Sequence, residues 1–143
     1  MDILLEEYAS FGNDLHEALT KERYDADSLA DVITTVSLQH EELLKMVACY
    51  ESSVYTRSSS QHMARYKKEW LTSFYEPLLS SLRFQYPNEG DGKLTEFIYV
   101  FISLLHSFYP ALTVKAGMRE EGEKFIRRSI LLSIKDIESE QAA

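Results

Sequence analysis

Residues 94–109 have the sequence LTEFIYVFISLLHSFY, in which apolar side chains fall on nearly every side of a helix. A helix that is apolar all round is normally enclosed by other helices. The stretch therefore predicts a buried apolar helix at about 94–109, with the rest of the chain packed around it. Pro110 is predicted to end this helix, because proline lacks a backbone donor.

The same region has to be weighed as a membrane span, since eighteen residues without a formal charge lie between Glu96 and Lys115. Spanning helices need roughly 20 apolar residues. Ser103 and His106 interrupt this run and leave a shorter apolar core. We expect a core helix, and do not expect the chain to bind a membrane.

The segments on either side of this helix have clear boundaries. Residues 84–93 contain PNEGDG, the densest cluster of turn formers in the chain, and predict an exposed loop. A final helix is expected to start near Gly117 or Met118, where acidic residues precede basic ones as the helix dipole favours. Residues 139–143 are expected to fray.

The first half of the chain predicts three helices by its spacing of apolar residues at three and four. The first covers residues 2–21, and the second runs from about 26 to 55 after the candidate N-caps Asp25 and Asp27. The third begins after Ser58, Ser59 or Ser60 and carries apolar residues as far as Leu82.

Pro77 lies inside the third apolar pattern. Proline removes a backbone donor and disfavours helical geometry at the residue before it. The helix is therefore predicted to kink, or to restart with Pro77 in its first turn, so that the chain turns near Tyr75.

Together these elements predict an all-α fold, a compact bundle of five or six helices around the apolar helix and no sheet. The length of 143 residues suits one domain covering residues 1–143. Up-and-down packing is one arrangement, and orthogonal packing around the apolar helix is the alternative.

Charge is distributed unevenly along the chain, which has a net charge of −8. Residues 1–56 carry twelve acidic and three basic residues, whereas residues 57–83 carry five basic and two acidic residues. An acidic first half repels nucleic acid and attracts basic surfaces. The single cysteine, Cys49, and the lack of a recognisable secretion signal predict a cytoplasmic protein.

No catalytic or metal-binding motif stands out among the polar residues. No histidine follows a glutamate at the spacing of a di-iron site, so we expect no metal or cofactor. His40 and His106 are interpreted as core histidines that find hydrogen-bond partners. Cys49 is interpreted as a small buried apolar residue.

One pattern of paired carboxylates suggests an alternative function. Glu6-Glu7 together with Asp27 and Asp31 resemble the acidic clusters with which all-α nucleotide pyrophosphohydrolases of the MazG type hold magnesium. The resemblance implies a magnesium-dependent nucleoside triphosphate pyrophosphohydrolase. Ser10 and Ser28 stand where the family has further acidic ligands.

Residues 65–70, RYKKEW, interleave bases with aromatic side chains, a combination that can bind nucleic acid. On a helix, however, Tyr66 and Trp70 share the inner face, while Arg65, Lys67 and Lys68 spread over the outer one. We expect this solvated basic face to pair with the acidic first two helices, and do not expect nucleic-acid binding.

The sequence thus favours a non-enzymatic helical module for protein–protein interaction, such as an adaptor, an assembly factor, a chaperone-like subunit or an inhibitor. Its partner is expected to be another protein with a basic surface, bound through the acidic surface or through tyrosines near helix ends. A homo-oligomeric structural subunit is a further alternative. The residues expected at the interaction surface are Glu6, Glu7, Glu41, Glu42, Arg65, Lys67 and Lys68.

Overall fold

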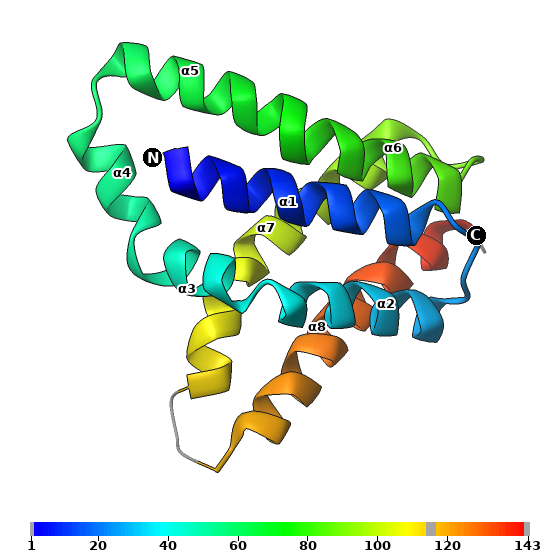
Figure 1. Cartoon of the computed structure of the whole chain (residues 1–143). Coiled ribbons are helices and arrows are strands. Elements are labelled where there is room, and N and C mark those ends of the chain that lie inside the picture. The colour runs from blue at the N-terminus through cyan, green and yellow to red at the C-terminus, as the bar shows by residue number, and fades with distance from the viewer. Residues whose placement is uncertain (1, 114–116, 142–143) are drawn as a thin grey trace.

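The computed structural model describes residues 2–113 and 117–141, and within these residues the chain is all-helical and contains no strand (Figure 1). The elements are α1 (Asp2–Leu19), α2 (Ala26–Gln39), α3 (Glu41–Cys49), α4 (Glu51–Arg57), α5 (Ser60–Trp70), the π-helical turn η1 (Leu71–Tyr75), α6 (Glu76–Gln85), α7 (Asp91–Thr113) and α8 (Arg119–Gln141). The all-α prediction is confirmed. The structure has more helical segments than the five or six expected, because the second and third predicted helices are each interrupted.

The predicted second helix is divided into α2, α3 and α4, so the expectation of one continuous helix was wrong. The interruptions are single residues, His40 and Tyr50, whose backbones leave helical geometry. His40 is held at the first break by a hydrogen bond to Asp14 of α1, with 2.7 Å between Nε2 and Oδ2. The predicted start is confirmed, since the Asp25 side chain accepts a hydrogen bond from the backbone of Ser28.

The third predicted helix starts where expected, with Ser59 as its N-cap, but it does not turn near Tyr75. Figure 1 shows α5, η1 and α6 as one long helical rod. Pro77 has no N–H to offer to the carbonyl of Ser73, and the helix widens so that the Glu76 N–H donates to the carbonyl of Leu71. A π-helical turn thus accommodates the proline without a sharp bend.

The connection between α6 and α7 comprises residues 86–90, shorter than the expected loop at 84–93. The helix α7 also continues past Pro110 to Thr113, contrary to the prediction that it ends at the proline. Phe108 and Leu112 on either side are buried, and this packing favours continued helix. Of the tail expected to fray, residues 139–141 are helical, and 142–143 lie outside the described residues.

Aromatic rings from α1, η1 and α7 form the centre of the core. Phe11 of α1 contacts Phe74 of η1 and Phe101 of α7, with ring centroids 5.6 and 6.2 Å apart. Phe101 in turn stacks on Phe97, and all four side chains are at most 4% exposed. The apolar stretch identified in the sequence therefore does contribute the core face of α7.

The helix α7 is nevertheless not enclosed on all sides, and that part of the prediction was wrong. Its buried residues form one face, whereas Tyr99 and Val100 on another face are 62% and 41% exposed. By length and composition alone, α7 is the one helix among the described residues that could span a membrane, a test that core helices also pass. One third of its apolar window is buried inside the protein.

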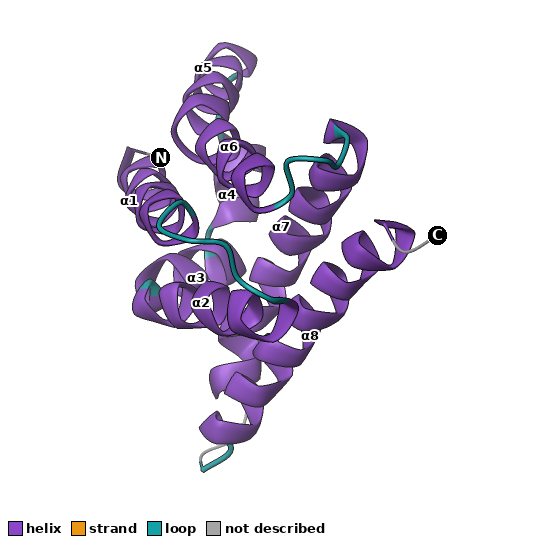
Figure 2. Ribbon diagram, turned by 90° about the vertical axis from the view of Figure 1, so that its right-hand side faces the viewer, coloured by secondary structure: helices purple, strands orange, loops and turns teal. Residues whose placement is uncertain are grey.

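Figure 2 shows how the elements are arranged. The helices α1 and α5 with α6 lie side by side, α7 packs against α6 and α3, and α8 lies beyond them against α7 and α2. Two arginines of α8 join it to the acidic first half: Arg119 pairs with Glu41 of α3, and Arg127 pairs with Asp27 and Asp31 of α2. The acidic helices are thus partly neutralised by α8.

Candidate protein-binding groove

The helices α1 and α5–η1–α6 run parallel and pack closely together at Gly12. A Cβ atom added to Gly12 would lie 2.6 Å from the backbone oxygen of Ser73, so only glycine fits. That oxygen is the one that Pro77 leaves without its usual helical donor. The π-turn and the glycine therefore set the spacing of the two helices.

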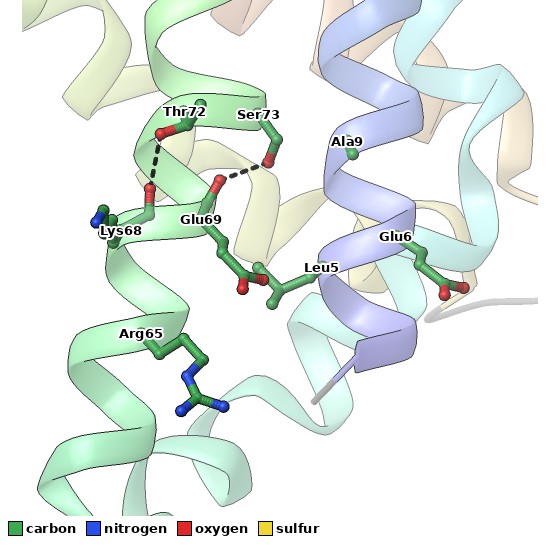
Figure 3. Close-up of a pocket in the computed structure, with 8 residues that line it drawn as sticks. All are labelled: Leu5, Glu6, Ala9, Arg65, Lys68, Glu69, Thr72 and Ser73. Atoms are coloured by element: carbon green, nitrogen blue, oxygen red, sulfur yellow. Dashed lines mark hydrogen bonds between the residues drawn. The ribbon is translucent and has the colours of Figure 1, made fainter.

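An open groove lies along the outer side of this seam. Its first part has a volume of about 790 Å³ and is lined by Leu5, Glu6, Ala9, Arg65, Lys68, Glu69, Thr72 and Ser73 (Figure 3). Its second part, of about 530 Å³, is lined by Ala9, Asn13, His16, Thr72, Ser73, Glu76, Pro77 and Ser80. The two parts share three lining residues and so form one continuous groove.

Two of the hydroxyl groups in the groove are already used by their own helix. Thr72 donates to the carbonyl of Lys68 at 3.0 Å, and Ser73 donates to the carbonyl of Glu69 at 2.7 Å, as the dashed lines in Figure 3 show. At the second part, the Nδ1 atom of His16 lies 3.1 Å from the carbonyl of Pro77. Among the described residues, Asn13, Ser80 and the charged side chains are left to bind a ligand.

These charged side chains are unpaired within the described chain and follow an order along the groove. Arg65 and Lys68 stand at the first end and make no ion pair with a described residue. Glu69 follows, and Glu76 stands in the second part of the groove. The first part of the groove therefore carries two bases together with the Glu69 carboxylate, the second part carries the Glu76 carboxylate, and the floor includes Leu5 and Ala9.

The structure brings together three of the seven residues predicted for the interaction surface. Glu6, Arg65 and Lys68 line the groove, although the Glu6 carboxylate points away from α5 in Figure 3. Lys67 lies on α5 outside the lining.

The other predicted residues lie elsewhere. Glu41 is engaged by Arg119, with 2.6 Å between Oε1 and Nη1, and Glu42 is exposed on α3. Glu7 is half-buried on α1 outside the lining. The expected pairing of the basic face of α5 with the acidic helices is not found in the described chain, because α8 supplies those partners.

The four carboxylates of the hydrolase alternative are not gathered into one site in the described chain. Asp27 and Asp31 both face Arg127, whereas Glu6 lines the groove. Residues 2–113 and 117–141 contain no group of three or more histidine, cysteine or acidic side chains placed to hold a metal ion. No observation here supports a shared magnesium site.

A buried carboxylate on α4 was missed by the sequence reasoning. Glu51, 5% exposed, accepts hydrogen bonds from Tyr8 at 3.0 Å and from Tyr55 at 2.9 Å. Its Oε2 atom also lies 3.5 Å from Nε2 of His106. The burial of Glu51 could not be predicted from neighbouring residues, because its partners Tyr8 and His106 come from distant segments of the chain.

Burial and the neighbouring Glu51 carboxylate raise the pKa of the surrounding tyrosines. The pKa of Tyr55 rises to about 12, and those of Tyr8 and Tyr66 rise further above the ordinary value. The Tyr66 hydroxyl is buried and has no hydrogen-bond partner. All three phenols therefore stay protonated around Glu51 at neutral pH.

Of the residues interpreted as buried, one agrees with the structure and two do not. The His40 side chain is 9% exposed and is bonded to Asp14, as expected of a core histidine. The His106 side chain is 50% exposed, and Cys49 is exposed, so both interpretations were wrong. Each lies on a helix that covers the core with only one face.

Comparisons of the chain with protein-family models, curated proteins and solved structures gave no match. The function has to be argued from the geometry of the groove.

Proposed function

We propose that this chain is a protein–protein interaction module and that its groove between α1 and α5–η1–α6 binds an amphipathic helix of another protein. The observation that carries the proposal is the order of charges along the groove, with Arg65, Lys68 and Glu69 in its first part and Glu76 in its second, none of them ion-paired with a described residue. Helix-in-groove binding is a common mode of peptide recognition.

The length of the groove supports a helical segment of about three turns. On α1 the lining extends from Leu5 to His16, which corresponds to roughly 16 Å of helix at about 1.5 Å per residue. Leu5, Ala9 and Pro77 supply apolar surface for the inward face of such a segment. Small residues such as Ala9 permit close approach of the bound helix.

The charges of the groove specify the partner further. Acidic side chains in the first turn of the bound helix would lie opposite Arg65 and Lys68, and basic side chains in its last turn opposite Glu76. This order is also the one that the helix dipole favours within the bound segment itself. The sequence suggested a partner with a basic surface. The groove suggests that the bound helix of this partner also has an acidic end.

The openness of the groove argues for a protein partner over a small molecule. Small-molecule sites usually bury most of the ligand surface and offer a few free hydrogen-bonding groups. Here the hydroxyls of Thr72 and Ser73 are bonded to their own helix, and the remaining polar groups, mostly charged, are spread along two helices. Such an arrangement suits the extended surface of a protein partner.

The proposal is tested by photo-crosslinking in the native host cell. A photoreactive amino acid at Thr72, which is exposed in the groove, should form an adduct with a protein partner. The same amino acid at Thr35, which is exposed on α2 outside the groove, serves as the matched control. Mass spectrometry of the adduct then identifies the segment that was bound.

The expected result is a Thr72-specific adduct with a segment of helical periodicity that is acidic at one end and basic at the other. Adding Arg65→Glu together with Lys68→Glu should reduce its yield by roughly tenfold, since each charged contact contributes about 1 kcal/mol or more. Equal yields from Thr72 and Thr35, or an adduct with no helical periodicity, would contradict the proposal.

A further inference from the structure

The far side of the molecule carries a second exposed surface, on the outer face of the α7–α8 hairpin. Its apolar stripe consists of Val100 of α7, Met118 directly before α8, and Phe125 and Leu132 of α8, which are 41%, 44%, 49% and 59% exposed. Two hollows of about 300 and 380 Å³ adjoin it, the first lined by Val100 and Leu132 and the second by Met118 and Phe125. Apolar groups gathered on one face in this way mark interaction surfaces.

The spacing on α8 is that of a helix–helix interface. Met118, Phe125 and Leu132 are each seven residues apart, so they follow one line along the helix. Gly122, whose Cβ would lie 2.1 Å from the backbone oxygen of Ala111, lets α8 pack tightly on α7. The hairpin therefore presents two close helices with a continuous apolar stripe.

We propose that this stripe binds a second copy of the chain, with the two α8 helices antiparallel about a two-fold axis at Phe125. Met118 and Leu132 are equally far from Phe125 in the sequence, so Met118 of each copy would face Leu132 of the other. The two Phe125 rings would meet at the axis. A surface that pairs with itself in this way is what a two-fold dimer requires.

The charges beside the stripe are complementary in the same arrangement. Glu121 lies four residues before Phe125 and Arg128 three residues after it, so the antiparallel pairing brings Glu121 of each copy beside Arg128 of the other. Both residues are exposed, and Arg128 forms no ion pair with a residue in the described ranges. Two symmetric ion pairs would thus flank the apolar centre.

The mixed charges also favour a second copy over a membrane surface. Helices that lie on anionic membranes carry mainly lysine and arginine around their apolar face. Here Glu121 and Asp136 stand close to the stripe together with Lys124 and Arg128. Acidic side chains at these positions would repel anionic lipid, whereas they complement the bases of a second copy.

Sedimentation velocity over a concentration series tests the dimer directly. The wild-type chain should approach twice its mass of 16.5 kDa as its concentration rises. Phe125→Glu should weaken the dimer by roughly tenfold or more, because it places two charges at the centre of the interface. Leu71→Glu, which alters an exposed apolar residue outside the stripe, is the matched control and should leave the dimer unchanged.

A charge exchange tests the antiparallel geometry. Glu121→Arg and Arg128→Glu should each weaken the dimer, because each places like charges together, and the double variant should restore it. Circular dichroism shows whether each variant remains helical. A dimer that survives Phe125→Glu, or a double variant weaker than both single ones, would overturn the arrangement.

Co-sedimentation with vesicles of phosphatidylcholine and phosphatidylserine tests whether the stripe binds a membrane instead. A wild-type chain that stays monomeric at every concentration overturns the proposal. If such a monomer sediments with vesicles and Phe125→Glu abolishes this binding, the stripe is a membrane surface instead. Neither outcome affects the groove, because that groove is lined by α1 and α5–η1–α6, whereas the stripe belongs to the α7–α8 hairpin.

Discussion

Tyr8 and Glu51 are 43 residues apart in the chain, yet the Tyr8 hydroxyl donates a hydrogen bond to the Glu51 carboxylate at 3.0 Å. This contact joins α1 to α4, which is only seven residues long and has a single half-buried aliphatic residue, Val54. Tyr8 also packs edge-on against Phe74 in the core. The carboxylate thus anchors a weakly packed helix to the centre of the protein.

Removal of this carboxylate should destabilise the fold. Glu51→Ala leaves the buried Tyr8 hydroxyl without an acceptor, at a cost of about 1–3 kcal/mol in the free energy of unfolding. Glu51→Gln retains an acceptor oxygen and should cost less. Urea unfolding measures both, with Ser52→Ala, an exposed neighbour, as the control.

A double-mutant cycle separates the contact from other effects of the substitution. Tyr8→Phe and Glu51→Ala together should cost less than the sum of the single variants, because each single variant already breaks the same hydrogen bond. Strict additivity of the two costs would show that the contact does not stabilise α4.

The tyrosines predict loss of stability at alkaline pH. The pKa of Tyr55 in the folded chain is about 12, and those of Tyr8 and Tyr86 lie further above the ordinary value of 10.0. The folded state therefore holds protons that the unfolded state releases near pH 10, so the free energy of unfolding falls as pH rises above about 10. Below that pH these tyrosines contribute no slope.

Urea unfolding at intervals from neutral pH to about pH 12 measures this slope. Tyr86→Phe removes one of the groups, whose hydroxyl donates to Glu138 at 2.7 Å, and should make the slope shallower. A free energy of unfolding that stays constant through this range would be inconsistent with protonated buried tyrosines.

Two glycine substitutions should have opposite effects. Gly12→Ala places a Cβ against the backbone oxygen of Ser73, which cannot easily move, and should destabilise the chain by about 1–3 kcal/mol. Gly92→Ala, in the first turn of α7, meets no atom within 4 Å and should be neutral or stabilising by up to about 1 kcal/mol. Thermal unfolding compares them, and equal effects would contradict the close helix contact.

Local signals in the sequence predicted the helices and their starts well. The caps at Asp25 and Ser59 and the core face of α7 all follow from neighbouring residues. The breaks at His40 and Tyr50 do not, because each irregular residue leaves the spacing of apolar residues nearly unchanged. Only the contact of His40 with Asp14 of α1 indicates the first break.

The sequence predicted some of the residues that line the groove, but it did not predict which charges pair with each other. Arg65 and Lys68 were identified as exposed bases, but the sequence paired them with the acidic helices. That pairing is made by Arg119 and Arg127, whose position depends on how α8 packs across α2 and α3. The burial of Glu51 depends in the same way on distant tyrosines.

The most direct test of the central claim measures how the partner identified from Thr72 binds to variants of α5. Arg65→Glu and Lys68→Glu reverse charges that line the groove, whereas Lys67→Glu makes the same change on the same helix outside it. Titration calorimetry with the identified helical segment should show roughly threefold weaker binding for each groove variant and unchanged binding for Lys67→Glu. Equal affinities for all three variants would contradict binding in the groove.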